Sequence, residues 1–244
     1  MTDNTARTPT VVLVHGAFAD AGSWADVADI LLKAGVPVLG PAVPLRGLAS
    51  DSAYIASVFS QIDGPVLAVG HSYGGALISN AAAASSNVVG LVFVSGFSPE
   101  VNEALSEVEG TSRDSALAPA LLQRTYPTGV GGETAIELYV DPAQFHRVFA
   151  GDLSEDQANV YGATQRPVAA AAFDERSSAA AWKTLPSWAV VARGDKAAGS
   201  DVILSMAQRA GAEIVELEGS HVIMISQPQP VADLILKALK AVTS

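Results

Sequence analysis

The 244-residue sequence contains no cysteine, few aromatic residues and few charges of either sign. Without cysteine, the chain has no disulfide, no thiolate metal site and no cysteine nucleophile. Aromatic residues make up 6% of the chain and charged residues 16%, with 14 basic side chains against 25 acidic ones. The resulting net charge of −11 disfavours nucleic acids and anionic membrane surfaces as partners, because both recruit basic patches.

Long hydrophobic runs are also missing, although 49% of the residues are hydrophobic. No apolar run reaches the roughly 18 residues that a membrane span needs. Residues 1–10 are polar and lack the apolar stretch of a secretory signal. We therefore expect a cytoplasmic protein that is a monomer or homodimer. The length is compatible with one domain over residues 1–244.

Short runs rich in β-branched residues alternate with helix-like segments over most of the chain. This alternation is typical of a parallel sheet with helices on both faces. The sequence thus predicts an α/β fold with about six strands. Strands are expected over residues 10–14, 36–39, 65–69, 88–94, 188–192 and 212–217, and helices over residues 24–34, 51–62, 74–84, 201–210 and 231–242.

The alternation stops between residues 98 and 185, which we call the lid. We expect the lid to be helical and to be inserted between core segments 9–97 and 186–244. A long insertion after a strand lies where ligands bind in open α/β sheets. Its helices are predicted over residues 116–124, 135–138, 141–149, 154–161 and 168–173.

The segment Gly70-His71-Ser72-Tyr73-Gly74 fits the pattern G-x-S-x-G. A predicted strand precedes it and a predicted helix follows it, as a nucleophile elbow requires. A serine on such a tight turn has a strained backbone, and the small glycines prevent collisions around it. The sequence therefore predicts that Ser72 is a nucleophile.

A serine hydroxyl needs a base to become a nucleophile, and the chain has four histidines. His221 follows the last predicted strand, so it lies at the edge of the sheet where the elbow is expected. His15 is expected to shape the loop after the first strand, and His71 to point away from Ser72. His146 is expected on a lid helix. We therefore assign the role of base to His221.

The histidine also needs a carboxylate that fixes its tautomer and stabilises the imidazolium. Asp195 follows a predicted core strand, and the order Ser72, Asp195, His221 is that of α/β-hydrolases. Asp201 and Glu100 are alternatives for the acid, although Asp201 has the position of a helix cap. The favoured triad is Ser72, His221 and Asp195.

Two backbone amides are expected to form an oxyanion hole. The amide of Tyr73 begins the helix after the elbow, where the helix dipole favours negative charge. The second donor is expected in the loop after the first strand. Ala17 is the favoured donor there, and Phe18 is the alternative.

These motifs together resemble the α/β-hydrolase superfamily. The resemblance is carried by residues 15–24 (HGAFADAGSW), the elbow at 70–75, Arg-Gly-Asp at 193–195 and Gly-Ser-His at 219–221. It extends over residues 9–242 and is weakest in the lid. Within the superfamily, the motifs are most similar to the branch of plant methyl-ester esterases, hydroxynitrile lyases and small bacterial esterases.

The resemblance implies an ester hydrolase that uses no cofactor. The lyases of that branch have a lysine after the catalytic histidine and a threonine in the first loop, where this chain has Val222 and Gly16. The related dehalogenases and epoxide hydrolases need a carboxylate where this chain has Ser72. Cleavage of a lactone or a carbon–carbon bond, and a receptor-like protein with low turnover, stay open as alternatives.

The substrate is expected to be a small ester bound under the lid. Scattered histidines without cysteine predict no metal site, and no phosphate-binding glycine loop is present. For every apolar lid residue, packing of the lid against the core is the alternative to contact with substrate. The substrate-binding candidates are Phe18, Tyr126, Phe145 and Trp182, and Leu121, Leu122, Phe149 and Tyr161 are further candidates for the pocket wall.

Overall fold

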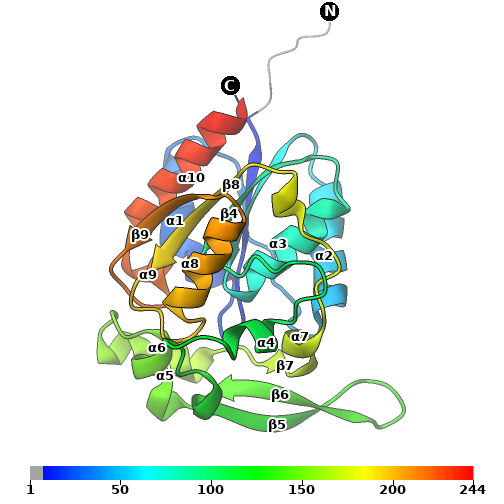
Figure 1. Cartoon of the computed structure of the whole chain (residues 1–244), viewed down its shortest axis with the longest axis vertical. Helices are drawn as coiled ribbons and strands as arrows, with labels where there is room; N and C mark the ends of the chain where they lie inside the picture. Colours follow the sequence, from blue (N-terminus) through cyan, green and yellow to red (C-terminus); the bar gives the residue numbers. More distant parts are fainter. Residues whose placement is uncertain (1–7, 244) are drawn as a thin grey trace, which may run out of the picture.

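The computed structural model describes residues 8–243 and contains a central sheet of six parallel strands (Figure 1). The strand order is β2-β1-β3-β4-β8-β9. Strands β3 and β8 are buried along their whole length, as their continuous apolar sequences predict. The predicted parallel sheet is confirmed. The strands are β1 (Thr10–Val14), β2 (Val38–Leu39), β3 (Val66–His71), β4 (Val88–Val94), β8 (Ser187–Ala192) and β9 (Glu213–Leu217).

Helices cover both faces of this sheet. Figure 1 shows α1 and α10 on one side, where they pack together, and α2 and α3 on the other. Each of the predicted core helices is present, with ends shifted by up to three residues. The core helices are α1 (Ala25–Lys33), α2 (Leu48–Ser60), α3 (Tyr73–Ala83), α8 (Ser200–Arg209), α9 (Ile223–Ser226) and α10 (Pro228–Thr243), with a 3-10 helix at Ala21–Trp24 before α1.

The strand order fixes where a ligand can bind. From β1 the chain goes to β2 on one side, and β3 then pairs with the other side of β1. Such a switch point opens a crevice at the carboxyl ends of the two strands. The loop that contains His15 and the turn that contains Ser72 follow β1 and β3 directly, so both meet at this crevice.

The lid is not purely helical, so that prediction was wrong in part. Strand β5 (Leu121–Pro127) pairs antiparallel with β6 (Thr134–Val140), which also pairs with β7 (Val168–Ala169). The helices predicted over 116–124 and 135–138 are therefore absent. Cross-strand pairing along the whole hairpin outweighs the local helix preference of a sequence such as Ala-Ile-Glu-Leu.

The other lid segments are short helices that begin at clear caps. Asp141 accepts a hydrogen bond from the amide of Ala143 at the start of α5, and Ser154 forms a capping box with Gln157 at the start of α6. These two helices confirm the predictions over 141–149 and 154–161. The segment 168–173 instead divides into β7 and α7. The lid helices are α4 (Leu105–Glu109), α5 (Pro142–Phe149), α6 (Glu155–Thr164) and α7 (Ala171–Asp174), with 3-10 helices at Ala118–Ala120 and Ala181–Lys183.

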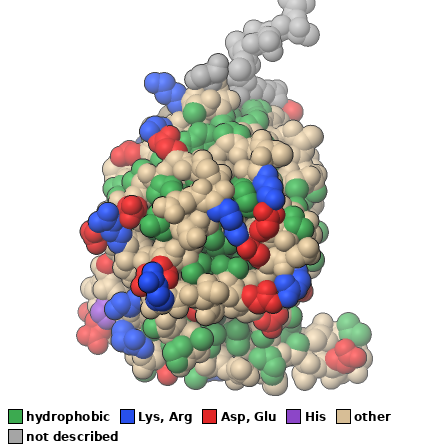
Figure 2. All heavy atoms as spheres, in the orientation of Figure 1, with side chains coloured by type: hydrophobic (Ala, Val, Ile, Leu, Met, Phe, Trp, Pro, Cys, Tyr) green, Lys and Arg blue, Asp and Glu red, His purple; other side chains and the backbone are tan. Residues whose placement is uncertain are grey.

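On the face shown in Figure 2, basic side chains lie beside acidic ones. Ion pairs such as Arg209–Glu103 and Arg176–Glu107 are of this kind. Exposed pairs contribute little to stability, roughly 0–1 kcal/mol each. Across residues 8–243, no helix has the length and apolar character needed to span a membrane.

Candidate active site

The turn between β3 and α3 places Ser72 at the crevice in a strained conformation. Ser72 has a φ of 53° and a ψ of −125°, which a non-glycine residue rarely adopts. The turn depends on close backbone approach. A Cβ on Gly74 would collide with the carbonyl oxygen of Val14, and one on Gly16 would lie 2.7 Å from the Cβ of Ser72. The geometry is that of a nucleophile elbow.

His221 and Asp195 form a buried hydrogen-bonded pair beside this turn. Nδ1 of His221 lies 2.7 Å from Oδ2 of Asp195, and both side chains are 1% exposed. The other oxygen of Asp195 accepts hydrogen bonds from the amides of Ala197 and Ala198, at 2.9 and 3.0 Å. These bonds fix the carboxylate, which in turn holds the proton of His221 on Nδ1. In the tautomer with its proton on Nδ1, His221 has an Nε2 that can accept a proton.

The two carboxylates considered as alternatives to Asp195 have other partners. Glu100 forms an ion pair with Lys183 at 2.6 Å. Asp201 accepts hydrogen bonds from the hydroxyl of Ser112 and the amide of Arg113. The structure therefore brings Asp195, and neither alternative, to His221.

His71 holds the backbone of His221, a contact that the sequence did not reveal. Nε2 of His71 donates a hydrogen bond to the carbonyl oxygen of His221 at 2.9 Å, and the ring centroids lie 4.7 Å apart. Burial and the neighbouring His221 lower the pKa of His71 well below its usual range, so its ring is neutral. The ring is directed to the loop that follows β9 and contains His221.

His15 joins the loops that follow β1 and β2. Its Nδ1 donates to the carbonyl oxygen of Gly16, and its Nε2 accepts from the amide of Val43, both at 2.9 Å. Burial lowers the pKa of His15 to about 4. The neutral ring thus supports the loop that was predicted to provide the second oxyanion donor.

The hydrogen bonds of that loop distinguish its two candidate donors. The amide of Phe18 donates to the carbonyl oxygen of Arg166 at 3.1 Å, so it is already occupied. Among residues 8–243, the amide of Ala17 has no hydrogen-bond partner. Tyr73 is the first residue of α3, and its amide has no partner within the helix. Neither of these two amides is occupied in the way that the amide of Phe18 is.

The side chain of Tyr73 is fixed on the other side of the elbow. Its hydroxyl donates to Oδ2 of Asp51 at 2.9 Å, and this carboxylate also accepts from the amides of Arg46 and Gly47. Asp51 is fully buried, and burial raises its pKa. The first residue of α3 is thus held through its side chain.

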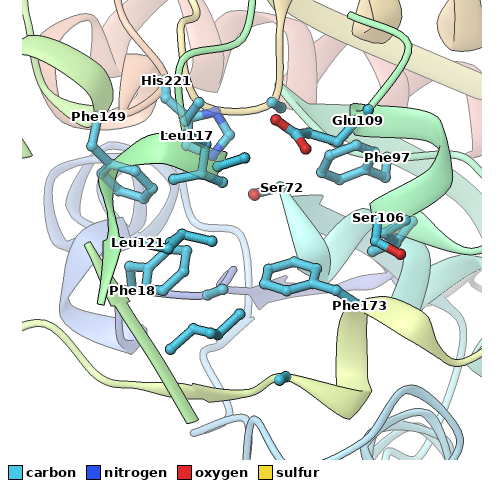
Figure 3. A pocket seen from close by; sticks show the side chains of 18 of the residues that line it. Phe18, Ser72, Phe97, Ser106, Glu109, Leu117, Leu121, Phe149, Phe173 and His221 are labelled. Atoms are coloured by element: carbon cyan, nitrogen blue, oxygen red, sulfur yellow. The ribbon is translucent and has the colours of Figure 1, made fainter. Parts of the chain in front are cut away.

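A cavity of about 470 Å³ lies between the elbow and the lid. Figure 3 shows the Ser72 hydroxyl and the His221 ring facing this space, which we call the main cavity. Most of its wall is apolar, as is usual for a small-molecule site. Its larger side chains are Phe18, Phe97, Leu105, Leu117, Leu121, Leu138, Phe149 and Phe173.

The predicted substrate-binding residues do not all reach the main cavity. Phe18 lines it, as do Leu121 and Phe149. Phe145 and Tyr161 line a smaller cavity of about 180 Å³, which Phe18 and Phe149 also border. Tyr126 packs under the guanidinium of Arg46 on another face of the lid hairpin.

Trp182 and Leu122 also lie elsewhere. The indole of Trp182 is buried and donates to the carbonyl oxygen of Pro99 at 2.9 Å. Leu122 is 38% exposed, because it is on the opposite face of β5 from Leu121. The 3-10 helix that contains Trp182 packs against core helix α3. For Trp182, the alternative of packing between lid and core is therefore the one that the structure supports.

Several residues of the cavity wall were not anticipated. Phe97 follows β4, Phe173 belongs to α7, and Glu109 ends α4. Their sequence context carries no motif. Phe97 reaches the cavity through the loop after β4, and Phe173 and Glu109 reach it through the fold of the lid. Among residues 8–243, no group of three histidine, aspartate or glutamate side chains is arranged to hold a metal ion.

The family of the chain follows from its sequence as a whole. The model of the alpha/beta hydrolase family matches residues 11–234. The chain belongs to the alpha/beta hydrolase family. The match includes the elbow and both members of the buried His221–Asp195 pair. No curated protein matches the sequence.

Solved structures of similar fold cover nearly the whole chain. Polyneuridine aldehyde esterase is 21% identical with a TM-score of 0.79, covering 95% of this chain and 99% of its own. Methylketone synthase I from tomato, in complex with 2-tridecanone, is 20% identical with a TM-score of 0.77, covering 96% and 99%. A pyrethroid hydrolase from Sphingobium faniae JZ-2 is 18% identical with a TM-score of 0.77, covering 96% and 98%. At these identities the likeness establishes a shared fold.

Proposed function

We propose that this α/β hydrolase cleaves small carboxylic esters through an acyl-enzyme on Ser72. The observation that carries the proposal is the buried pair of His221 and Asp195 beside a strained serine in one cavity. A serine, a base and a group that orients the base are what nucleophilic catalysis requires. The esterase and hydrolase names of similar structures support this reaction class.

In the first half of the reaction, Nε2 of His221 removes the proton of the Ser72 hydroxyl while its oxygen attacks the ester carbonyl carbon. The carbonyl electrons move to oxygen, where the amides of Ala17 and Tyr73 stabilise the charge. Each such donor contributes about 10²–10³-fold to the rate. His221 then gives its proton to the leaving alcohol as the carbon–oxygen bond breaks.

In the second half, His221 removes a proton from water, which attacks the acyl group on Ser72. Collapse of the second oxyanion releases the carboxylic acid, and His221 returns the proton to Ser72. Asp195 keeps its negative charge throughout and stabilises the imidazolium. No metal or cofactor enters these steps.

Hydrolysis of short p-nitrophenyl esters tests the proposal. The wild type should release p-nitrophenol, and Ser72→Ala should be slower by at least about 10³-fold, since it loses the nucleophile. Ser79 is a fully buried serine of α3 outside the cavity, so Ser79→Ala is a matched control that should keep most activity. Equal turnover by wild type and Ser72→Ala would contradict the proposal.

A further inference from the structure

The main cavity has an unbalanced charge. Two carboxylates line it, Glu109 at the end of α4 and Asp174 at the end of α7. Within the described part of the chain, no lysine or arginine lines this cavity. A substrate that enters it therefore meets negative charge without a compensating cation.

Glu109 is the carboxylate that lies among the apolar groups of the site. Figure 3 shows its side chain directed into the cavity, near Phe97 and on the same side as His221. It accepts a hydrogen bond from the hydroxyl of Ser115, and among residues 8–243 it has no ion-pair partner. Because the surrounding wall is apolar, its field is screened less than that of a surface carboxylate.

Aromatic rings provide an independent reason for the cavity to bind cations. Phe97, Phe173, Phe18 and Phe149 all line it. The faces of such rings attract ammonium groups, and aromatic pockets are a recurrent means of binding quaternary ammonium. A carboxylate together with aromatic walls favours a cationic group of low hydration and disfavours an anionic one.

We infer that Glu109 is a specificity-determining residue that makes the main cavity select esters with an ammonium group over neutral ones, and neutral esters over anionic ones. The inference rests on the proposed function where turnover is concerned, but the preference applies to binding as well. The net charge of −11 acts in the same direction, because it attracts cationic substrates from solution.

A pair of isosteric substrates isolates charge from shape. Acetylcholine and 3,3-dimethylbutyl acetate differ in one atom, the cationic nitrogen or the neutral carbon. We expect kcat/KM for acetylcholine to exceed that for the neutral ester by about tenfold, or about 1.4 kcal/mol. In Glu109→Gln the ratio should fall to about threefold or less. Monomethyl succinate, an anionic ester, should be the poorest substrate of the wild type.

Glu107→Gln is the matched control. Glu107 belongs to the same short helix, but its side chain is exposed and forms an ion pair with Arg176 at 2.5 Å. This variant removes one negative charge from α4 without changing the cavity wall, so it should keep the wild-type ratio. A similar loss of selectivity in both variants would show that only the net charge matters, and would overturn the assignment to Glu109.

A measurement of binding makes a second test that does not depend on catalysis. Calorimetry with choline and with 3,3-dimethylbutanol compares the two groups without hydrolysis. If no ester is hydrolysed, the proposed function fails, and the binding ratio alone then decides this inference. Tighter binding of choline that is weakened in Glu109→Gln supports it. Equal binding of both alcohols, or a preference that Glu109→Gln leaves unchanged, overturns it.

Discussion

His71 and His221 are joined by a hydrogen bond of 2.9 Å from the ring of His71 to the backbone carbonyl of His221. The two residues are 150 positions apart in the chain, and both are buried. The residue beside the proposed nucleophile thus fixes the loop that carries the proposed base. The positions of Ser72 and His221 are therefore coupled through the backbone as well as through the cavity that they share.

Replacing His71 by Phe should affect both stability and catalysis. The ring volume is kept, but the carbonyl oxygen of His221 loses its donor in a buried site. Such a loss costs about 1–3 kcal/mol in free energy of unfolding. Because the loop of His221 becomes less well held, kcat should fall by about tenfold or more while KM changes little. Chemical denaturation and ester kinetics measure these effects.

His146 provides the control for this variant. Its Nε2 also bonds a backbone carbonyl, that of Leu153 at 3.0 Å, but in the lid. His146→Phe should therefore leave kcat within about twofold of the wild type. If His71→Phe also kept its kcat, the positioning role of His71 would be wrong.

Asp195→Asn should nearly abolish activity while the chain remains folded. An amide in place of the carboxylate cannot hold the proton of His221 on Nδ1, and the analogous change in serine proteases costs about 10⁴-fold. Asp201→Asn and Glu100→Gln should stay within about threefold of the wild type, because those carboxylates bind other groups. Activity that survives in Asp195→Asn and is lost in either of the others would reassign the acid.

Because of His15, the free energy of unfolding should fall as the solution becomes more acidic. Its pKa is about 4 when folded, lower than the ordinary value of 6.5, because its ring is buried. Between these two pH values the unfolded chain binds the proton and the folded chain does not. Stability therefore falls as the pH drops from about 6.5 to 4, by up to about 3 kcal/mol for this residue.

Urea unfolding of the wild type and of His15→Gln at pH 7 and pH 4.5 measures this contribution. Glutamine has no proton to gain, so the difference in stability between the two proteins should shrink at pH 4.5. A difference that is the same at both pH values would show that His15 does not titrate in this range.

Gly74→Ala should destabilise the fold strongly, because its Cβ would overlap the carbonyl oxygen of Val14 at the elbow. Overpacking of this kind costs roughly 1–3 kcal/mol or more. Gly151→Ala is a suitable control, since its Cβ would lie 3.5 Å from the nearest atom, an ordinary contact. Thermal unfolding of both variants should show a large decrease in Tm only for Gly74→Ala.

The core of this protein could be predicted from sequence because its signals are local. Buried parallel strands are continuous apolar runs, and the elbow motif lies between a strand and a helix, so Ser72 is placed by its neighbours. Asp195 and His221 each follow a core strand, and the carboxyl ends of parallel strands lie at one edge of the sheet. Their meeting point follows from topology alone.

The lid could not be predicted in the same way. The strand that contains Ile136 mixes residues that favour strands, such as Ile136 and Val140, with the helix formers Ala135 and Glu137. Its pairing with β5 and β7 therefore decides its conformation. The hydrogen bond from the amide of Phe18 to the carbonyl oxygen of Arg166 also depends on the path of the lid. For the same reason, Glu109 has no sequence signal that distinguishes it from Glu107, although only Glu109 lines the main cavity.

The most direct test of the account is covalent labelling of Ser72 by a fluorophosphonate, followed by mass spectrometry of the digested protein. The account predicts one adduct on the peptide that contains Ser72 in the wild type. It also predicts labelling slower by at least about 10³-fold in His221→Ala, which lacks the base. No adduct at Ser72, or labelling at the same rate in both proteins, would contradict a serine nucleophile activated by His221.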